Sequence, residues 1–142
     1  MQHLALVAHD HKKADMVAWA TFNRTTLSGF RLVGTRHTAR LLRDKVGLEV
    51  DEVLSGAEGG DAQIASLVAT RAVQSVFFFV DPSTTQPHDP DIRALLRVCN
   101  VHNVPLATNV ATADLVIAAL SGTPVERLGP AASPAAPAPP AS

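Results

Sequence analysis

The stretch Val76-Phe77-Phe78-Phe79-Val80 consists of five apolar residues in succession. An unbroken apolar run of this length is typical of a strand in the middle of a parallel sheet, where both faces are covered. A second run, Leu4–Ala8, lies near the start of the chain. We therefore predict that these two segments form the centre of a sheet, and both are too short to cross a membrane.

The segments around these two runs alternate between strand-like and helix-like patterns. Further strands are predicted at Phe30–Gly34, Val50–Leu54 and Leu106–Ala107. Apolar residues at helical spacing predict the helices between them. These helices span Asp10–Phe22, Thr38–Lys45, Asp61–Ala72, Pro90–Asn100 and Ala111–Leu120. The alternation predicts the α/β class, with a single domain built on a doubly wound five-stranded parallel sheet that carries helices on both faces.

Length, charge and cysteine content limit the possible functions. The chain has 142 residues, a net charge of −1 and one cysteine, Cys99. Charges of both signs are spread along the chain, so we expect no nucleic-acid partner and no membrane partner. A single cysteine excludes an internal disulfide and fits a reducing compartment, so we expect a cytoplasmic protein. Residues 129–142 are only Gly, Pro, Ala and Ser, which predicts a disordered tail after a domain of residues 1–128.

Polar segments follow every predicted strand. Because parallel strands end at the same edge of a sheet, and ligands of such folds bind at that edge, these segments are expected to share one cleft. The segments are His9–Lys13, Thr35–Thr38, Ser55–Asp61, Asp81–Pro82 with His88–Asp91, and Thr108–Asn109.

The residue types in this cleft favour an anionic ligand. The loop from Ser55-Gly56 to Gly59-Gly60 enters a predicted helix, and such a loop can bring backbone N–H groups close to an anion. Thr35, Thr38 and Ser55 add hydroxyl donors, and Lys13 adds a positive charge. Together they predict a phosphate-binding site, and ordinary turns and helix caps are the alternative for any single residue.

Carboxylates and histidines in the same loops admit acid–base chemistry. Asp10, Asp61, Asp81 and Asp91 are candidates, and a crowded carboxylate shielded from water can act as a base. A metal site built from His9-Asp10-His11 and His88-Asp89 is the alternative. That spacing matches no specific zinc or iron signature, so no metal is expected.

Four segments resemble the methylglyoxal synthase family. They are LVAHDHKK (6–13), LSGAEGGD (54–61), DPSTTQPHDPDIRALLR (81–97) and PLATNVATAD (105–114). The resemblance implies a carbon–oxygen lyase that converts dihydroxyacetone phosphate into methylglyoxal and inorganic phosphate. It also implies no metal or organic cofactor, a homohexamer and allosteric inhibition by phosphate. A non-catalytic anion-sensing domain of the same fold is the alternative function.

The resemblance also implies a role for each site residue. Asp61 would be the base, and His88 would polarise substrate oxygens with support from Asp91 and Asp10. His9 would help to bind substrate. The phosphate would be held by Lys13, Thr35, Thr38, Ser55 and Gly56.

One loop departs from the family pattern. Where the family has a Thr-Gly-Thr-Thr-Gly type of loop, this chain has Thr35-Arg36-His37-Thr38-Ala39. Arginine tolerates a positive φ poorly, so a changed loop path is one expectation. Arg36 and His37 are then candidate phosphate ligands that compensate for the lost backbone donors. The alternative is that Arg36 points to solvent and that the altered loop is merely tolerated.

Overall fold

The structure is a computed structural model, which describes residues 2–83 and 89–122. The predicted tail, the domain boundary at residue 128 and the candidate residue His88 lie outside the described residues.

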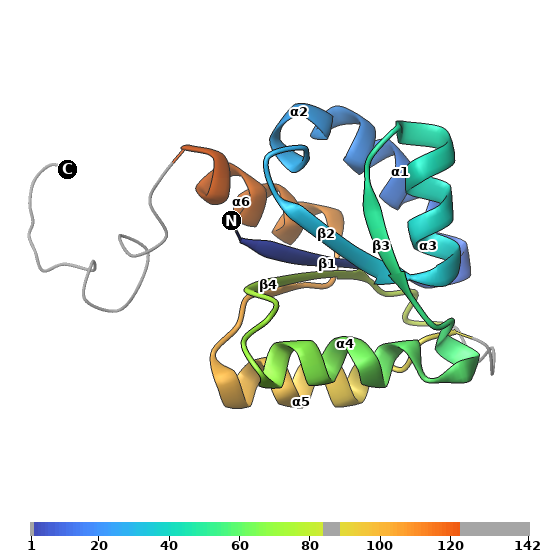
Figure 1. Ribbon diagram of the computed structural model, residues 1–142, viewed down its shortest axis with the longest axis vertical. Helices are drawn as coiled ribbons and strands as arrows, with labels where there is room; N and C mark the ends of the chain where they lie inside the picture. Colours follow the sequence, from blue (N-terminus) through green and yellow to red (C-terminus); the bar gives the residue numbers. More distant parts are fainter. Residues whose placement is uncertain (1, 84–88, 123–142) are drawn as a thin grey trace, which may run out of the picture.

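A five-stranded, all-parallel sheet forms the centre of the fold, as predicted (Figure 1). Its order is β3-β2-β1-β4-β5, and the register places Leu6 opposite both Gly34 and Phe77. The strands are β1 (His3–Ala8), β2 (Arg31–Thr35), β3 (Val50–Val53), β4 (Ser75–Phe79) and β5 (Leu106–Ala107).

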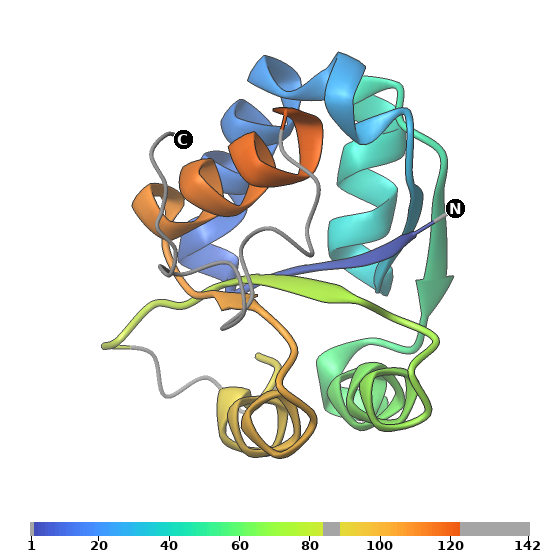
Figure 2. The ribbon, with the colours of Figure 1, turned by 90° about the vertical axis from the view of Figure 1, so that its left-hand side faces the viewer.

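Helices cover both faces of the sheet, which confirms the doubly wound architecture (Figure 2). On one face lie α1 (Lys13–Phe22), α2 (Arg24–Leu27), α3 (Arg36–Leu41) and α6 (Val110–Gly122). On the other face lie α4 (Gly60–Ala69) and α5 (Ile92–His102). The remaining helical segments are the 3-10 helices η1 (Asp10–Lys12) and η3 (Gly56–Glu58) and the π-helix η2 (Leu42–Val46).

The three phenylalanines of β4 supply both hydrophobic cores. Because side chains alternate along a strand, Phe77 and Phe79 face the layer that contains α1, and both contact the ring of Trp19. Phe78 faces the opposite layer with Ile64 of α4 and belongs to the second cluster. All three phenylalanines are at most 1% exposed, so the apolar run that predicted a central strand is confirmed.

Several predicted boundaries were wrong. The helix predicted from Thr38 begins at Arg36, because Thr35 has extended backbone and stands directly before the first helical turn. The helix predicted from Pro90 begins at Ile92, because Asp91 caps it by accepting a hydrogen bond from the N–H of Arg93. The short elements α2 and η3 were not predicted.

The connections of β1 and β4 separate at the carboxyl edge of the sheet. These two strands are neighbours, yet β1 leads into α1 on one face whereas β4 leads toward α5 on the other. In parallel α/β folds, ligands bind where adjacent connections part in this way. Within the part of the chain that the structure describes, no helix is long and apolar enough to span a membrane.

Candidate functional site

His9 joins the loops that follow β1 and β4. Its Nδ1 atom accepts a hydrogen bond from the N–H of Asp81 at 2.9 Å, and its Nε2 atom lies 2.8 Å from the carbonyl oxygen of Pro90. Because Nδ1 accepts from an amide, the ring proton is on Nε2, which donates to Pro90. The ring is 4% exposed and meets Phe78 edge to face. In this arrangement both nitrogens of His9 hold the backbone of the surrounding loops.

Asp61 occupies the first turn of α4, behind a turn that requires glycine. A Cβ atom on Gly60 would lie 1.8 Å from the carbonyl oxygen of Leu54, and Gly59 has a φ of +100°. The Asp61 Oδ2 atom accepts a hydrogen bond from the N–H of Asp91 at 2.6 Å, and Oδ1 accepts from the N–H of Ala62 at 2.9 Å. Two of the predicted catalytic residues, far apart in sequence, are therefore adjacent at this edge.

Asp91 is held in its ionised form by Arg93. Its Oδ1 atom accepts from Arg93 Nε at 3.2 Å and from the Arg93 backbone N–H at 2.9 Å. These bonds, with the guanidinium bond as the stronger cause, hold the pKa of Asp91 below its usual value. Asp91 is consequently a negatively charged helix cap beside Asp61.

Asp10 connects the first loop to the segment before α5. Lys13 Nζ donates to Asp10 Oδ1 at 2.5 Å, and the backbone N–H of Asp10 donates to Asp89 Oδ1 at 3.2 Å. The candidate His88 directly precedes Asp89 in sequence and lies outside the described residues. Lys13, predicted to bind phosphate, is paired with a carboxylate in this structure.

The residues predicted to bind phosphate divide into buried and accessible groups. Thr35 and Thr38 are buried, and the Thr38 Oγ1 atom has no hydrogen-bond partner among residues 2–83 and 89–122. Such an orphaned buried hydroxyl is uncommon in folded proteins. Ser55 and Gly56 are half-buried, whereas His37 is exposed.

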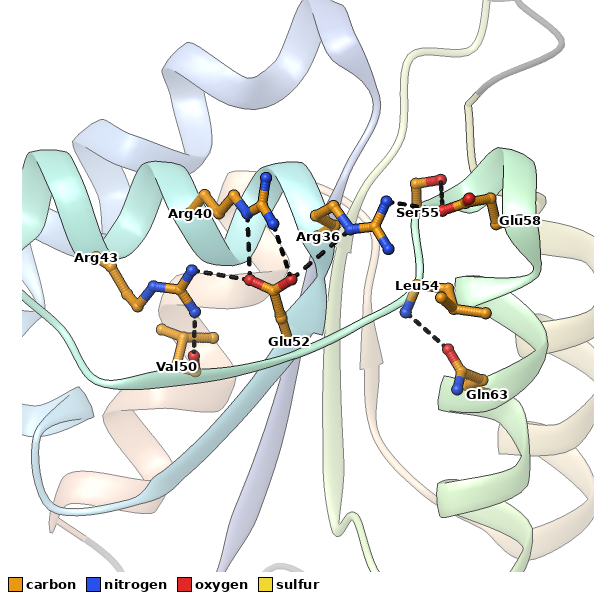
Figure 3. A network of polar contacts seen from close by, with 9 residues as sticks. All are labelled: Arg36, Arg40, Arg43, Val50, Glu52, Leu54, Ser55, Glu58 and Gln63. Carbon is orange, nitrogen blue, oxygen red and sulfur yellow. Dashed lines mark hydrogen bonds and ion pairs between the residues drawn. The ribbon is translucent and has the colours of Figure 1, made fainter.

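Arg36 does not strain the loop after β2. Among the described residues other than glycine, only Arg71 and Asn103 have positive φ, and Arg36 is the first residue of α3. The chain enters α3 directly after β2, with Arg36 as the first helical residue, and the expected difference from the family's loop path stays a prediction. The Arg36 side chain extends to Glu58, where Nη1 donates to Oε1 at 2.8 Å (Figure 3).

A cluster of arginines lies beside this contact. Glu52 of β3 pairs with Arg36, Arg40 and Arg43, whose nearest nitrogens lie at 3.7, 3.3 and 2.8 Å (Figure 3). Hydrogen bonds from Arg43 and then Arg40 lower the pKa of Glu52. Glu52 therefore stays charged and anchors the exposed side of α3 to β3.

Two further carboxylates organise the site, and the sequence analysis named only the first of them, Asp81, as a candidate base. Asp81 is buried and accepts hydrogen bonds from Ser83 Oγ at 2.7 Å and Ser83 N–H at 3.0 Å. These bonds, with a smaller contribution from His11, lower its pKa. The other is Glu58. The available signals were the Asp-Pro-Ser sequence after a strand and the position of Glu58 between the candidate phosphate ligand Gly56 and the candidate base Asp61.

Comparison with known proteins settles the family. An MGS-like domain model matches residues 15–108. A methylglyoxal synthase of Cupriavidus pinatubonensis is 57% identical over 118 residues, which cover 83% of this chain and 91% of that protein. This chain belongs to the methylglyoxal synthase family. A second methylglyoxal synthase, from Ralstonia nicotianae, is 52% identical over 84% of this chain and 88% of its own length.

A solved structure agrees with the sequence matches. The crystal structure of a methylglyoxal synthase from Elizabethkingia anophelis superposes with a TM-score of 0.81 and 42% sequence identity. The match covers 84% of this chain and 80% of that one. The predicted family, fold class and enzyme class, a lyase of the methylglyoxal synthase family, are confirmed. The comparisons favour this enzyme over the anion-sensing alternative, and the roles of individual residues remain predictions.

The metal alternative has no counterpart in the described part of the site. Within residues 2–83 and 89–122, no group of three or more histidine, cysteine, aspartate or glutamate side chains is arranged to hold a metal ion. His11 contacts Asp81 at 3.0 Å, and His9 bonds to backbone groups.

Proposed function

We propose that this protein converts dihydroxyacetone phosphate into methylglyoxal and inorganic phosphate, with Asp61 as the base. The observation that carries the proposal is the hydrogen bond between Asp61 Oδ2 and the N–H of Asp91 at the carboxyl edge of the sheet. This bond places the proposed base beside Asp91, a second predicted catalytic residue. Ser55 and Gly56 lie in the short loop that directly precedes Asp61. Membership of the methylglyoxal synthase family supports the assignment.

The first step is proton transfer from carbon. Asp61 removes a proton from the hydroxymethyl carbon next to the carbonyl group, and the C–H electron pair moves into a carbon–carbon double bond. The carbonyl oxygen becomes negatively charged, which gives an enediolate. Asp61 takes the proton with Oδ2, the oxygen that accepts a hydrogen bond from the N–H of Asp91 in this structure. Its other oxygen, Oδ1, stays bound to the N–H of Ala62, and this bond preserves the orientation of the carboxylate.

The charge that develops on oxygen requires a hydrogen-bond donor. His88 is proposed for this task, supported by Asp91 and Asp10, because a positioned donor stabilises an enediolate more than the neutral carbonyl. The bond from the Asp10 N–H to Asp89 supports this role, since it ties the first loop to the neighbour of His88. His9 is proposed to assist substrate binding, and its bonds to Asp81 and Pro90 support a contribution through loop position.

The second step is elimination of phosphate. A proton passes from the hydroxyl group on the first carbon to the oxygen of the former carbonyl group, so that the negative charge moves to the first oxygen. That oxygen then forms the aldehyde C=O bond, and the carbon–carbon double bond shifts toward the phosphate-bearing carbon. The bond from that carbon to the bridging oxygen breaks, and phosphate leaves with the oxygen. The resulting enol takes up a proton on carbon and becomes methylglyoxal. Elimination is favoured when the breaking bond stands perpendicular to the enediolate plane. Holding the phosphate in that position is the task proposed for Lys13, Thr35, Arg36, His37, Thr38, Ser55 and Gly56.

Assembly, regulation and location are part of the same proposal. Phe22 of α1 and Leu115 of α6 are 88% and 75% exposed, and large exposed apolar side chains support association with further copies of the chain. We propose a closed homohexamer that phosphate inhibits allosterically. A cytoplasmic location is proposed because the single cysteine fits a reducing compartment.

The test is to incubate the purified protein with dihydroxyacetone phosphate and to quantify both products during the initial phase. The proposal predicts methylglyoxal and inorganic phosphate in equal molar amounts. Release of phosphate without methylglyoxal would indicate a phosphatase. Binding of phosphate without any turnover would support the anion-sensing domain.

A further inference from the structure

One carboxylate oxygen of Glu58 accepts hydrogen bonds from two side chains that are proposed to bind phosphate. Arg36 Nη1 donates to Oε1 at 2.8 Å, and Ser55 Oγ donates to the same oxygen at 3.1 Å (Figure 3). A carboxylate oxygen and a phosphate oxygen are both anionic acceptors that suit these donors. Glu58 and a phosphate group therefore compete for the same two side chains.

The local backbone places Glu58 in this position. Ser55 precedes η3, and its carbonyl oxygen accepts the N–H groups of Glu58 at 3.0 Å and Gly60 at 2.8 Å. The turn closes through Gly59, whose positive φ suits glycine. The chain thus folds back on Ser55, so that the Glu58 carboxylate reaches both the serine hydroxyl and Arg36. The Ser55 hydrogen bond and the charge of Arg36 lower the pKa of Glu58, which keeps the carboxylate charged near neutral pH.

Arg36 is held from a second side as well. Its Nε atom lies 3.7 Å from Glu52, and Glu52 is also bound by Arg40 and Arg43. The Arg36 guanidinium group therefore lies between two carboxylates, that of Glu52 on β3 and the more exposed one of Glu58. Of these two carboxylates, only Glu58 also accepts a hydrogen bond from the Ser55 hydroxyl group. Displacement of Glu58 therefore frees both Arg36 and Ser55, two of the proposed phosphate ligands.

We propose that Glu58 is an internal competitor of the phosphate group, and that the ligand displaces it from Arg36 and Ser55. This inference rests on the proposed function, since it concerns the same phosphate-binding residues. Glu58 weakens the binding of substrate and of inorganic phosphate in the ground state. It also promotes product release, because the carboxylate returns to its donors as phosphate leaves.

Glu58 could instead help phosphate to bind, and the two roles predict opposite changes in phosphate affinity when Glu58 is replaced. If Glu58 only positions Arg36 for the ligand, its removal weakens phosphate binding. The experiment is calorimetric titration of the protein with inorganic phosphate, comparing wild type with Glu58→Gln. Competition predicts that the dissociation constant falls about two- to fivefold, as expected from loss of one exposed ion pair. An unchanged or increased dissociation constant overturns the proposal.

Two further variants separate displacement from simple loss of negative charge. Glu52→Gln removes the same charge from the same arginine without freeing Ser55, so its gain in affinity is smaller than that of Glu58→Gln. In an Arg36→Ala background, the gain from Glu58→Gln shrinks, because only the Ser55 contact remains to be released. The proposal is overturned if phosphate affinity rises by the same factor for Glu58→Gln, for Glu52→Gln, and for Glu58→Gln in the Arg36→Ala background. Such a result would show that only the loss of a nearby negative charge matters.

Failure of this inference can be distinguished from failure of the proposed function. Wild-type protein that forms methylglyoxal, together with a Glu58→Gln variant of unchanged phosphate affinity, refutes the competitor alone. Wild-type protein that neither binds phosphate nor forms methylglyoxal refutes both. Thermal unfolding of each variant checks that the fold is intact, which is expected because the Glu58 side chain is 53% exposed.

Discussion

The carboxylate of Asp61 is bound to the backbone N–H of Asp91 across 2.6 Å, although thirty residues separate them in sequence. This bond joins the start of α4 to the start of α5 at the edge where β1 and β4 end. A second bond, from the N–H of Ala62, fixes the other oxygen. The proposed base is thus oriented by backbone groups, whose positions depend on the turns around it.

The turn before Asp61 gives the first prediction. Gly60→Ala places a methyl group against the carbonyl oxygen of Leu54, so the backbone must shift. We expect a loss of about 1–3 kcal/mol in the free energy of unfolding, as for other overpacked sites. Turnover should fall as well, because Asp61 follows directly. Denaturant unfolding measures the first effect.

Gly122→Ala is the matched control, since a Cβ atom there meets nothing within 4 Å among the residues that the structure describes. Equal stability of the two variants would contradict the argument from close approach.

His9 gives the second prediction. His9→Ala leaves the N–H of Asp81 and the carbonyl oxygen of Pro90 without their partner at a buried site. Each unsatisfied buried group costs about 1–3 kcal/mol, so the free energy of unfolding should drop clearly. His11→Ala removes a side chain that is 73% exposed and should have little effect. A His9→Ala variant as stable as His11→Ala would refute the positioning role.

The third prediction concerns acid stability. The pKa of Asp81 is lowered by its bonds to Ser83, so the carboxylate stabilises the fold above its ordinary pKa near 3.8. That contribution is lost as the pH falls through the lowered value in the folded protein. Asp81→Asn should therefore reduce the thermal midpoint at neutral pH, and the difference from wild type should narrow below about pH 4. A difference that is constant down to pH 2 would argue against this linkage.

Cys99 gives the fourth prediction. The thiol is 1% exposed, and burial raises its pKa to about 11. At pH 8 roughly one molecule in a thousand then carries a thiolate, the form that reacts. A chromogenic disulfide reagent should label the native protein very slowly and the denatured protein rapidly. Fast labelling of the native protein would show that the cysteine is accessible.

The sheet could be predicted from the sequence because each strand is marked by its own short apolar run, and such runs recur along the chain. The runs Leu4–Ala8 and Val76–Val80 are apolar on both faces, and all their residues except the half-buried Val80 lie in the core. Helix starts were less predictable, since residue types that favour helix caps, such as Asp91 and Thr35, occur at several neighbouring positions and the sequence does not show which of them is used.

The candidate residues were found by their position after strands, but their partners were not. The pairing of Asp61 with Asp91 depends on how α4 and α5 pack. The contact between Arg36 and Glu58 joins residues 22 positions apart and depends on the turn through Gly59. Spacing along the chain does not encode such contacts, so the role of Glu58 became visible only in three dimensions.

The fifth prediction tests the central claim. In Asp61→Asn the side chain keeps its shape and an oxygen that can accept from the backbone, but it no longer acts as a base at neutral pH. A positioned general base contributes about a hundred- to ten-thousand-fold in rate, and turnover should fall by that factor. Asp44→Asn, an exposed substitution in η2, serves as the control with unchanged turnover.

The decisive measurement is the initial rate of methylglyoxal formation from dihydroxyacetone phosphate in wild type, Asp61→Asn and Asp44→Asn, side by side. The account predicts activity in the wild type and in Asp44→Asn. It predicts loss of activity in Asp61→Asn, which should still fold and bind inorganic phosphate. Near wild-type formation of methylglyoxal by Asp61→Asn would contradict it.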